Sequence, residues 1–200
     1  MNARNIPALT GILVAINVIV FVLLEFIFPP EVYNAGVLSV LSLMHGQWWT
    51  LFTSMFLHGG VLHLACNMVS LVYLGTICEQ VFGKWKFLLL YMVSGLVGGL
   101  AYVGVNALLG DFTGAVGASG AIFGLFGAYG LLLFRERKQA TVFIHPTSHS
   151  EVSSYLGFLA VNLFIGLSSP GIANEAHVGG LICGFLIAAI MYPFLAKRFR

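Results

Sequence analysis

Charged side chains are scarce in this sequence. Its 200 residues include nine lysines and arginines and seven aspartates and glutamates, so that 8% of the chain is charged, against about a quarter in a typical soluble domain. So little charge excludes a soluble globular domain. Apolar residues make up 59% of the chain, and composition alone therefore predicts a membrane protein whose main surroundings are the lipid bilayer. We expect no nucleic-acid partner.

Cysteine is also rare, and none of the three cysteines forms a CxxC pair. Cys66, Cys78 and Cys183 all lie in apolar segments, where we interpret them as small packing residues rather than as disulfide partners or metal ligands. His145 and His149 lie in a polar loop, but a zinc site there would need further ligands that the sequence does not offer. We therefore expect no metal and no cofactor.

The features of a cleavable signal peptide are missing from the N-terminal segment. A single basic residue, Arg4, precedes a long apolar run, and no A-x-A cleavage motif closes that run. We therefore expect the first apolar run to be a membrane span.

Long apolar runs are what the sequence has in abundance. A helix needs about 20 mostly apolar residues to cross the hydrocarbon core, and six segments reach or approach this length: 8–28, 61–79, 87–109, 115–134, 152–167 and 176–196. The stretch 29–60 is apolar but interrupted by Pro29, Pro30 and several glycines, and its Trp48 and Trp49 suit the membrane interface. We predict one domain over residues 1–200, an all-α membrane protein with six transmembrane helices and a membrane-embedded first loop.

The basic residues predict the orientation of these spans. If the N-terminus is cytoplasmic, all nine fall on the cytoplasmic side: Arg4, Lys84, Lys86, Arg135, Arg137, Lys138, Lys197, Arg198 and Arg200. The positive-inside rule asks for this arrangement. Both termini are therefore predicted to be cytoplasmic.

This topology brings polar residues of three spans to one depth. The second, fourth and sixth spans all run inward from the outer face, and near their outer ends lie His58, His63, Asn67, Ser119 and His177. Taken singly, each is compatible with an interhelical hydrogen bond worth about 1 kcal/mol. Together they suggest function, because intramembrane histidines usually mark functional sites and an imidazole can activate a serine hydroxyl as a nucleophile.

A Ser–His dyad fits the sequence better than a triad. No aspartate or glutamate lies within a span close to His177, and Glu175 is in the loop that precedes it. The oxyanion of a tetrahedral intermediate needs donors that are already in position. His63, the Asn67 amide and the free backbone N–H groups at the start of the helix that carries Ser119 can supply them.

Glycines recur at helical spacing on two of these spans. They are Gly117, Gly120, Gly124 and Gly127 on the fourth span, and Gly180 and Gly184 on the sixth. Such small-residue faces let helix backbones approach closely, and here they are expected to hold Ser119 against His177. Many membrane bundles use the same device, as Gly95 and Gly99 on the third span illustrate, so the glycines alone do not indicate catalysis.

Three motifs, in this order, resemble those of the rhomboid intramembrane serine proteases: HGGVLHLACN (58–67), GASGAIFG (117–124) and AHVGGLICG (176–184). The segment YLGTICEQVFG (73–83) is also similar, and the resemblance covers nearly the whole chain. It implies Ser119 as the nucleophile and His177 as the general base and later acid. It further implies an oxyanion hole made by His63, Asn67 and the Ser119 backbone N–H, with Gly117 leaving room for the substrate backbone.

The resemblance also assigns roles to the loops and reveals two departures. The family's first loop is embedded in the membrane, its fifth span is a proposed gate for substrate, and its last loop, here LSSPGIANE (167–175), caps the site. The first loop often carries Trp-Arg, but here Trp49 is followed by Thr50. Phe123 replaces a tyrosine that stacks under the catalytic histidine, and we expect the stacking and the activity to be retained.

The sequence thus predicts a six-helix bundle of rhomboid type that cleaves transmembrane segments of other membrane proteins. Water is expected to reach the dyad through a polar funnel around His45, His58 and the cap loop. The short chain favours a prokaryotic plasma membrane, and the oligomeric state is left open. Two alternatives are a catalytically inactive relative that binds transmembrane clients, and a small transporter. The grouping of polar residues at one depth favours the protease over the transporter.

Overall fold

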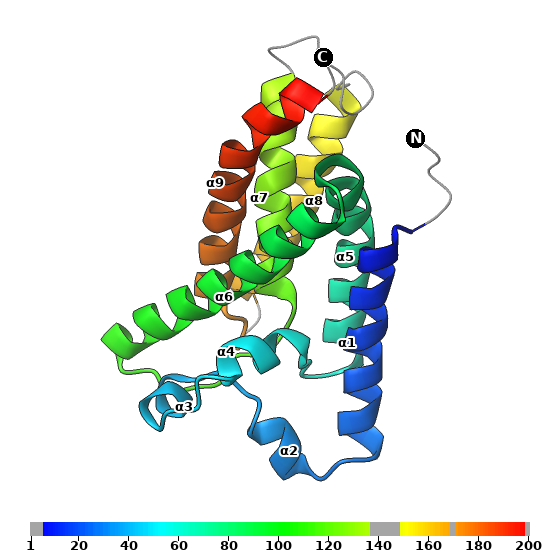
Figure 1. Cartoon of the computed structure of the whole chain (residues 1–200). Coiled ribbons are helices and arrows are strands. Elements are labelled where there is room, and N and C mark those ends of the chain that lie inside the picture. The colour runs from blue at the N-terminus through cyan, green and yellow to red at the C-terminus, as the bar shows by residue number, and fades with distance from the viewer. Residues whose placement is uncertain (1–5, 137–148, 169–170, 199–200) are drawn as a thin grey trace.

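The computed structural model describes residues 6–136, 149–168 and 171–198, which form a bundle of helices (Figure 1). The long helices are α1 (Ala8–Phe26), α5 (Val61–Phe82), α6 (Lys84–Leu109), α7 (Ser119–Glu136), α8 (His149–Ser168) and α9 (Asn174–Arg198). Between α1 and α5 lie four short helical segments: α2 (Pro30–Asn34), α3 (Val40–Met44), α4 (Thr50–Thr53) and the 3₁₀ turn η1 (Ser54–Phe56).

The long helices follow the apolar runs. Five of them match the predicted segments to within three residues at either end. By length and composition, α1, α5, α6 and α9 can each cross a membrane, while α7 and α8 are apolar over the shorter ranges 119–135 and 151–166. This set of apolar helices confirms the prediction of an all-α membrane protein.

The fourth predicted span differs from the structure at its start. Helix α7 begins at Ser119 rather than at residue 115, because the residues before it are extended and pair with the first loop. Leu38 and Ala115 exchange two backbone hydrogen bonds of 3.2 and 2.7 Å, and the Gly117 N–H donates to the Ser54 carbonyl at 2.9 Å. These long-range contacts override the local apolar pattern, and they place Ser119 at the very start of a helix.

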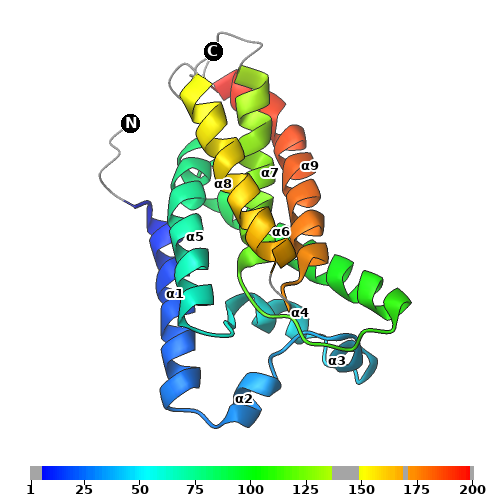
Figure 2. The same ribbon diagram turned by 180° about the vertical axis from the view of Figure 1, so that it is seen from behind.

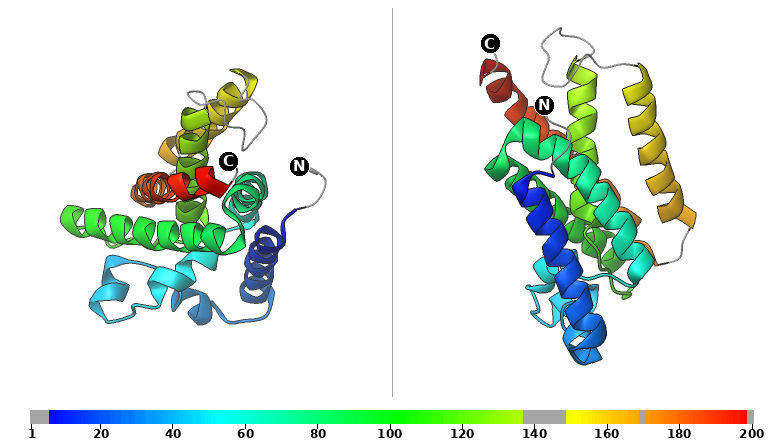
Figure 3. Two further views of the ribbon diagram at one scale, coloured as in Figure 1. Left: turned by 45° about the horizontal axis from the view of Figure 1, so that its top comes forward. Right: turned by 90° about the vertical axis from the view of Figure 1, so that its right-hand side faces the viewer.

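Helix α7 lies at the centre of the bundle and packs most extensively against α9, while α6 crosses both (Figure 1). Helix α1 runs beside α5 on the other side of the molecule. In the view from behind, helix α8 lies at the front of the molecule, next to α7 (Figure 2). Seen from the side, α8 is the long helix most separated from the others (Figure 3), and it makes only limited contact with α7 and α9.

The first loop is ordered by its own hydrogen bonds, and Thr50 is one of its anchors. The Thr50 side chain is fully buried; its hydroxyl donates to the Gln47 carbonyl at 2.7 Å and lies 3.1 Å from the Ser42 hydroxyl. The Trp49 indole N–H donates to the Ala35 carbonyl at 3.0 Å. The Thr50 hydroxyl therefore fixes this part of the loop, at the position where the resemblance in sequence favours an arginine.

The start of α1 is held by a carboxylate from another helix. Glu79 on α5 is buried and accepts hydrogen bonds from the backbone N–H groups of Leu9 and Thr10, at 3.1 and 2.7 Å, and from the Thr10 hydroxyl at 2.8 Å. The first N–H groups of a helix have no partners within it, and an anion there is favoured by the helix dipole. Glu79 therefore acts as a cap that fastens α1 to α5.

Candidate active site

Ser119 is the first residue of α7, and its position follows from the extended segment that precedes it. Since the first N–H groups of a helix have no intrahelical acceptors, the backbone around Ser119 presents free donors. The hydroxyl Oγ of Ser119 lies 2.8 Å from Nε2 of His177, which is in the first turns of α9. This is hydrogen-bonding distance for a nucleophile and its base.

Phe123 holds the imidazole of His177 from below. The two rings are stacked, with centroids 4.2 Å apart and planes 5° from parallel. Both residues are buried, at 2% and 6% exposed. Phe123 is one helical turn after Ser119, so a single helix supplies both the hydroxyl and the surface on which the imidazole rests.

Glycines bring α7 and α9 together below this pair. A Cβ added to Gly180 would collide with the Gly120 carbonyl, and one added to Gly184 would collide with the Gly124 carbonyl. Neither position can carry a side chain unless the helices separate. The close approach places the start of α9 against the start of α7, and Ser119 meets His177 as a result.

The side chains of His63 and Ser119 both lie close to the position that a Cβ atom on Gly117 would occupy. A Cβ built on Gly117 would lie 2.8 Å from His63 Nε2 and 3.5 Å from Ser119 Oγ, and the φ of Gly117 is +132°, which L residues rarely adopt. The Gly59 N–H donates to His63 Nδ1 at 3.4 Å. A neutral imidazole that accepts at Nδ1 carries its proton at Nε2, so His63 presents an N–H donor beside the serine oxygen.

Asn67 and His58 lie near His63 on either side of it along the chain. The Asn67 amide is buried and donates one hydrogen bond to the His63 carbonyl at 3.0 Å, which leaves a second N–H. The His58 ring packs edge-on against His63, with centroids 5.2 Å apart. Burial, and to a lesser extent the neighbouring His63, lowers the pKa of His58 to about 4, so this ring is neutral at ordinary pH.

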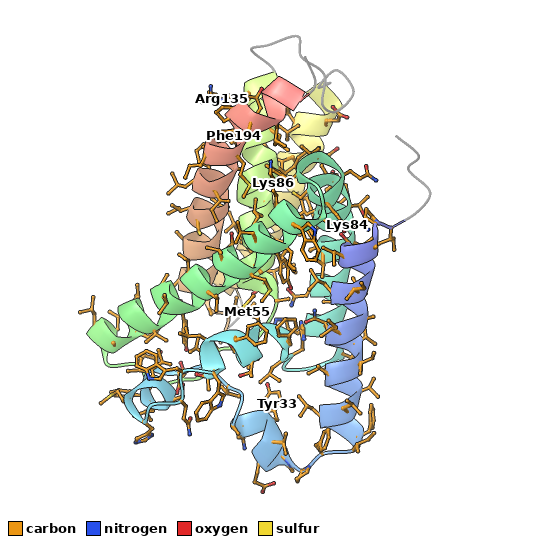
Figure 4. All side chains as sticks on the ribbon, viewed as in Figure 1. Tyr33, Met55, Lys84, Lys86, Arg135 and Phe194 are labelled. Carbon is orange, nitrogen blue, oxygen red and sulfur yellow. The ribbon has the colours of Figure 1, made fainter. Side chains whose placement is uncertain are left out.

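A cavity of about 30 Å³ borders Ser119, and it is large enough to hold a water molecule. Its lining includes Ser54 and Met55 of the first loop and Gly95 and Gly99 of α6, and it contains neither His45 nor His58. Met55 lies under α6 in Figure 4. The lining thus mixes glycines and alanines with larger side chains such as Met55 and Tyr102, and the polar funnel around His45, His58 and the cap loop stays a prediction.

No carboxylate completes the Ser–His pair among the residues that the structure describes. His177 Nδ1 is buried without a hydrogen-bond partner. Within the same described residues, no three His, Cys, Asp or Glu side chains lie close enough to hold a metal ion. His145 lies outside the described residues. Residues 169–170 of the expected cap loop also lie outside the described residues.

Two residues that hold the segment before α7 in place could not be recognised from the local sequence. Ser54 holds the Gly117 N–H through its backbone carbonyl, and any residue type can offer that carbonyl. Leu38 pairs with Ala115 from 77 positions earlier in the chain, a contact that depends on how the first loop folds. Both determine where α7 starts, and only the structure reveals them.

A family model described as "Rhomboid domain" matches residues 45–194. Among similar curated proteins, the rhomboid protease GluP of Bacillus subtilis is 32% identical over 196 residues, covering 92% of this chain and 35% of GluP. RHOMBOID-like protein 1 of Arabidopsis thaliana is 37% identical over 156 residues, covering 78% and 38%. The rhomboid protease AarA of Providencia stuartii is 32% identical over 213 residues, covering 96% and 75%. The chain thus spans little more than a third of the first two relatives and three quarters of the third.

Proposed function

The chain belongs to the rhomboid family, and from this premise we propose that it is an intramembrane serine endopeptidase. Its substrates would be other membrane proteins, cut within or next to a transmembrane segment. The observation that carries the proposal is the 2.8 Å approach of Ser119 Oγ to His177 Nε2 inside a bundle of apolar helices.

Each residue of the pair has a defined role in this proposal. His177 Nε2 takes the proton of the Ser119 hydroxyl as Oγ attacks the carbonyl carbon of the scissile bond. His177 then passes this proton to the leaving amine, and an acyl-enzyme remains on Ser119. A water molecule, which the cavity beside Ser119 can hold, attacks the acyl group with His177 again as the base.

The oxyanion needs hydrogen-bond donors before the reaction begins. We assign this role to the Ser119 backbone N–H, the Nε2–H of His63 and the second N–H of the Asn67 amide. Support comes from the shared point above Gly117, which borders both His63 Nε2 and Ser119 Oγ. Gly117 would leave this point free for the substrate carbonyl, while Phe123, Gly120, Gly180 and Gly184 would keep His177 in place.

The substrate would have to unwind before it is cut. Backbone carbonyls inside a helix are engaged in hydrogen bonds and covered by side chains, so a serine cannot attack them directly. Segments with small or helix-breaking residues should therefore be favoured, because they unwind at a lower cost.

We further propose six spans forming one domain, with both termini in the cytoplasm. Lys84, Lys86 and Arg135 lie toward one end of the molecule, and Tyr33 on α2 lies toward the other (Figure 4). Basic residues favour the cytoplasmic side, so the end that carries α2 would face outward, as would Ser119 and His177 at the starts of α7 and α9.

The test is cleavage of a reporter with one transmembrane segment by the purified protein in lipid vesicles. Wild type is expected to release two fragments, and Ser119→Ala and His177→Ala to release none. Ser154→Ala is the matched control, since its side chain is exposed, and it should cleave like wild type. Thermal unfolding of each variant checks that the fold persists.

Three results would refute the proposal. Continued cleavage by Ser119→Ala would exclude the serine as nucleophile. Capture of the reporter by wild type without any cleavage would indicate a non-catalytic relative that binds transmembrane clients, and transport of a solute that survives Ser119→Ala would indicate a transporter.

A further inference from the structure

Asn174 is a polar residue beside the pair that has no role in the mechanism above. It is the first residue of α9, three positions before His177. Its Nδ2 donates to the Gly166 carbonyl near the end of α8, at 3.1 Å, and more weakly to the Ile172 carbonyl, at 3.5 Å. Two carbonyl oxygens facing Nδ2 fix the orientation of the amide, because the reversed amide would turn its own oxygen against them.

The oxygen of this amide points into a space that it shares with His177. Asn174 Oδ1 and His177 Nδ1 are both buried and without hydrogen-bond partners among the described residues. A Cβ built on Gly166 would lie 2.5 Å from Asn174 Oδ1 and 3.5 Å from His177 Nδ1. The two atoms therefore border one small space, and a glycine at position 166 keeps that space open.

The chemistry of the dyad needs an acceptor at this place. For Nε2 to take the proton of Ser119, the neutral imidazole must carry its own proton on Nδ1. A buried N–H without an acceptor is costly, and the cost grows when the ring becomes a cation during the reaction. Asn174 Oδ1 is an acceptor of suitable chemistry, and amide oxygens hold the catalytic histidine in some cysteine proteases.

We propose that Asn174 is a positioning residue for His177. Its Oδ1 accepts the Nδ1–H of His177 through one bridging water molecule, since the two atoms form no direct hydrogen bond, and so fixes the tautomer and ring orientation that Ser119 requires. This inference rests on the proposed roles of Ser119 and His177. Because Nδ2 of the same amide is tied to Gly166, the end of α8 also holds the acceptor in place.

Two substitutions at Asn174 separate this role from that of a simple tether between α8 and α9. Asn174→Ala removes the acceptor and the tether, whereas Asn174→Asp keeps an oxygen acceptor and loses the Nδ2 donor. With the transmembrane reporter, Asn174→Ala should lower kcat roughly 10- to 100-fold, the loss expected for a hydrogen bond to a charged group, with KM little changed. Asn174→Asp should keep most of the activity. If Asn174→Asp is as inactive as Asn174→Ala, the proposal is wrong.

A methyl group in the shared space provides a second test. Gly166→Ala should displace Asn174 Oδ1 and lower kcat in the same way. Gly157→Ala is the matched control on the same helix, because a Cβ there has no atom within 4 Å, and it should behave like wild type. Unchanged kcat in Gly166→Ala would overturn the proposal.

Proton NMR of the protein in micelles tests the contact without relying on activity. The Nδ1–H resonance of His177, identified by its loss in His177→Ala, should be present in wild type, Ser119→Ala and Asn174→Asp, and lost or shifted in Asn174→Ala. An unchanged resonance in Asn174→Ala would refute the contact. If wild type cleaves no reporter but the resonance depends on Asn174, the proposed protease function fails and the contact remains.

Discussion

At the scale of single residues, the stacking of Phe123 on His177 shows how a side chain without polar atoms can orient an imidazole. The Phe123 ring lies flat under the imidazole of His177, 4.2 Å away, and fixes the plane in which Nε2 meets Ser119. The hydroxyl of the more usual tyrosine is not needed for this contact, since the stacking involves only the rings.

Substitution of Phe123 tests the stacking. Phe123→Leu should lower kcat roughly 2- to 10-fold, because an aromatic pair contributes about 0.5–1.5 kcal/mol beyond the area that it buries. Phe123→Tyr keeps the ring and should stay close to wild type. Steady-state cleavage of the transmembrane reporter measures both. A Phe123→Leu variant as active as Phe123→Tyr would show that the stacking has no part in catalysis.

The sequence predicted the serine, the histidines and Asn67 as members of one site because of their types and their common depth, whereas the stacking of Phe123 was implied only by the family resemblance. It gave no reason to single out Asn174, because the segment 167–175 was expected to be a loop, whereas in the structure Asn174 is the first residue of α9. Thr50 was noted as a departure from the family pattern, but its buried hydrogen bonds to Gln47 and Ser42 depend on a fold of the first loop that no local pattern encodes.

At the scale of helices, the contact between α7 and α9 is the feature that brings the site together. Gly184 meets the Gly124 carbonyl with no room for a Cβ, two turns along α9 from His177. Helix packing at this place therefore determines the distance between Ser119 and His177 at the starts of the two helices.

A methyl group at Gly184 should push the helices apart. We expect Gly184→Ala to lower the free energy of unfolding by about 1–3 kcal/mol, as overpacking does, and to reduce cleavage because Ser119 and His177 separate. Gly104→Ala on α6 is the matched control, since its Cβ would have no neighbour within 4 Å. Thermal unfolding in detergent and reporter cleavage measure the two effects; equal stability of the two variants would contradict the packing argument.

The lengths of the apolar runs predicted the bounds of five long helices well. They failed at the start of α7, where tertiary contacts determine the backbone conformation. Residues 115–118 continue the apolar pattern of α7, yet they are not helical, because Ala115 pairs with Leu38 and Gly117 with Ser54. This difference makes Ser119 the first residue of its helix, where the backbone N–H groups have no acceptors within the helix, as the proposed oxyanion hole requires.

At the scale of the whole molecule, the distribution of charge predicts how the protein lies in the membrane. Cysteines placed in a variant without Cys66, Cys78 and Cys183 can test it. Glu31→Cys on α2 should react with a membrane-impermeant maleimide added outside intact cells, whereas Lys86→Cys should react only after permeabilisation. Both native side chains are exposed, so access depends on sidedness alone. The opposite labelling pattern would invert the proposed topology.

The central claim is that Ser119 is a nucleophile activated by His177, and covalent labelling tests it most directly. The purified protein is treated with a fluorophosphonate, and the modified residue is identified by mass spectrometry. The adduct should form on Ser119 in wild type, should not form in His177→Ala, and should not appear on the exposed Ser154 in either protein. An unlabelled Ser119 in wild type, or labelling that persists in His177→Ala, would contradict the account.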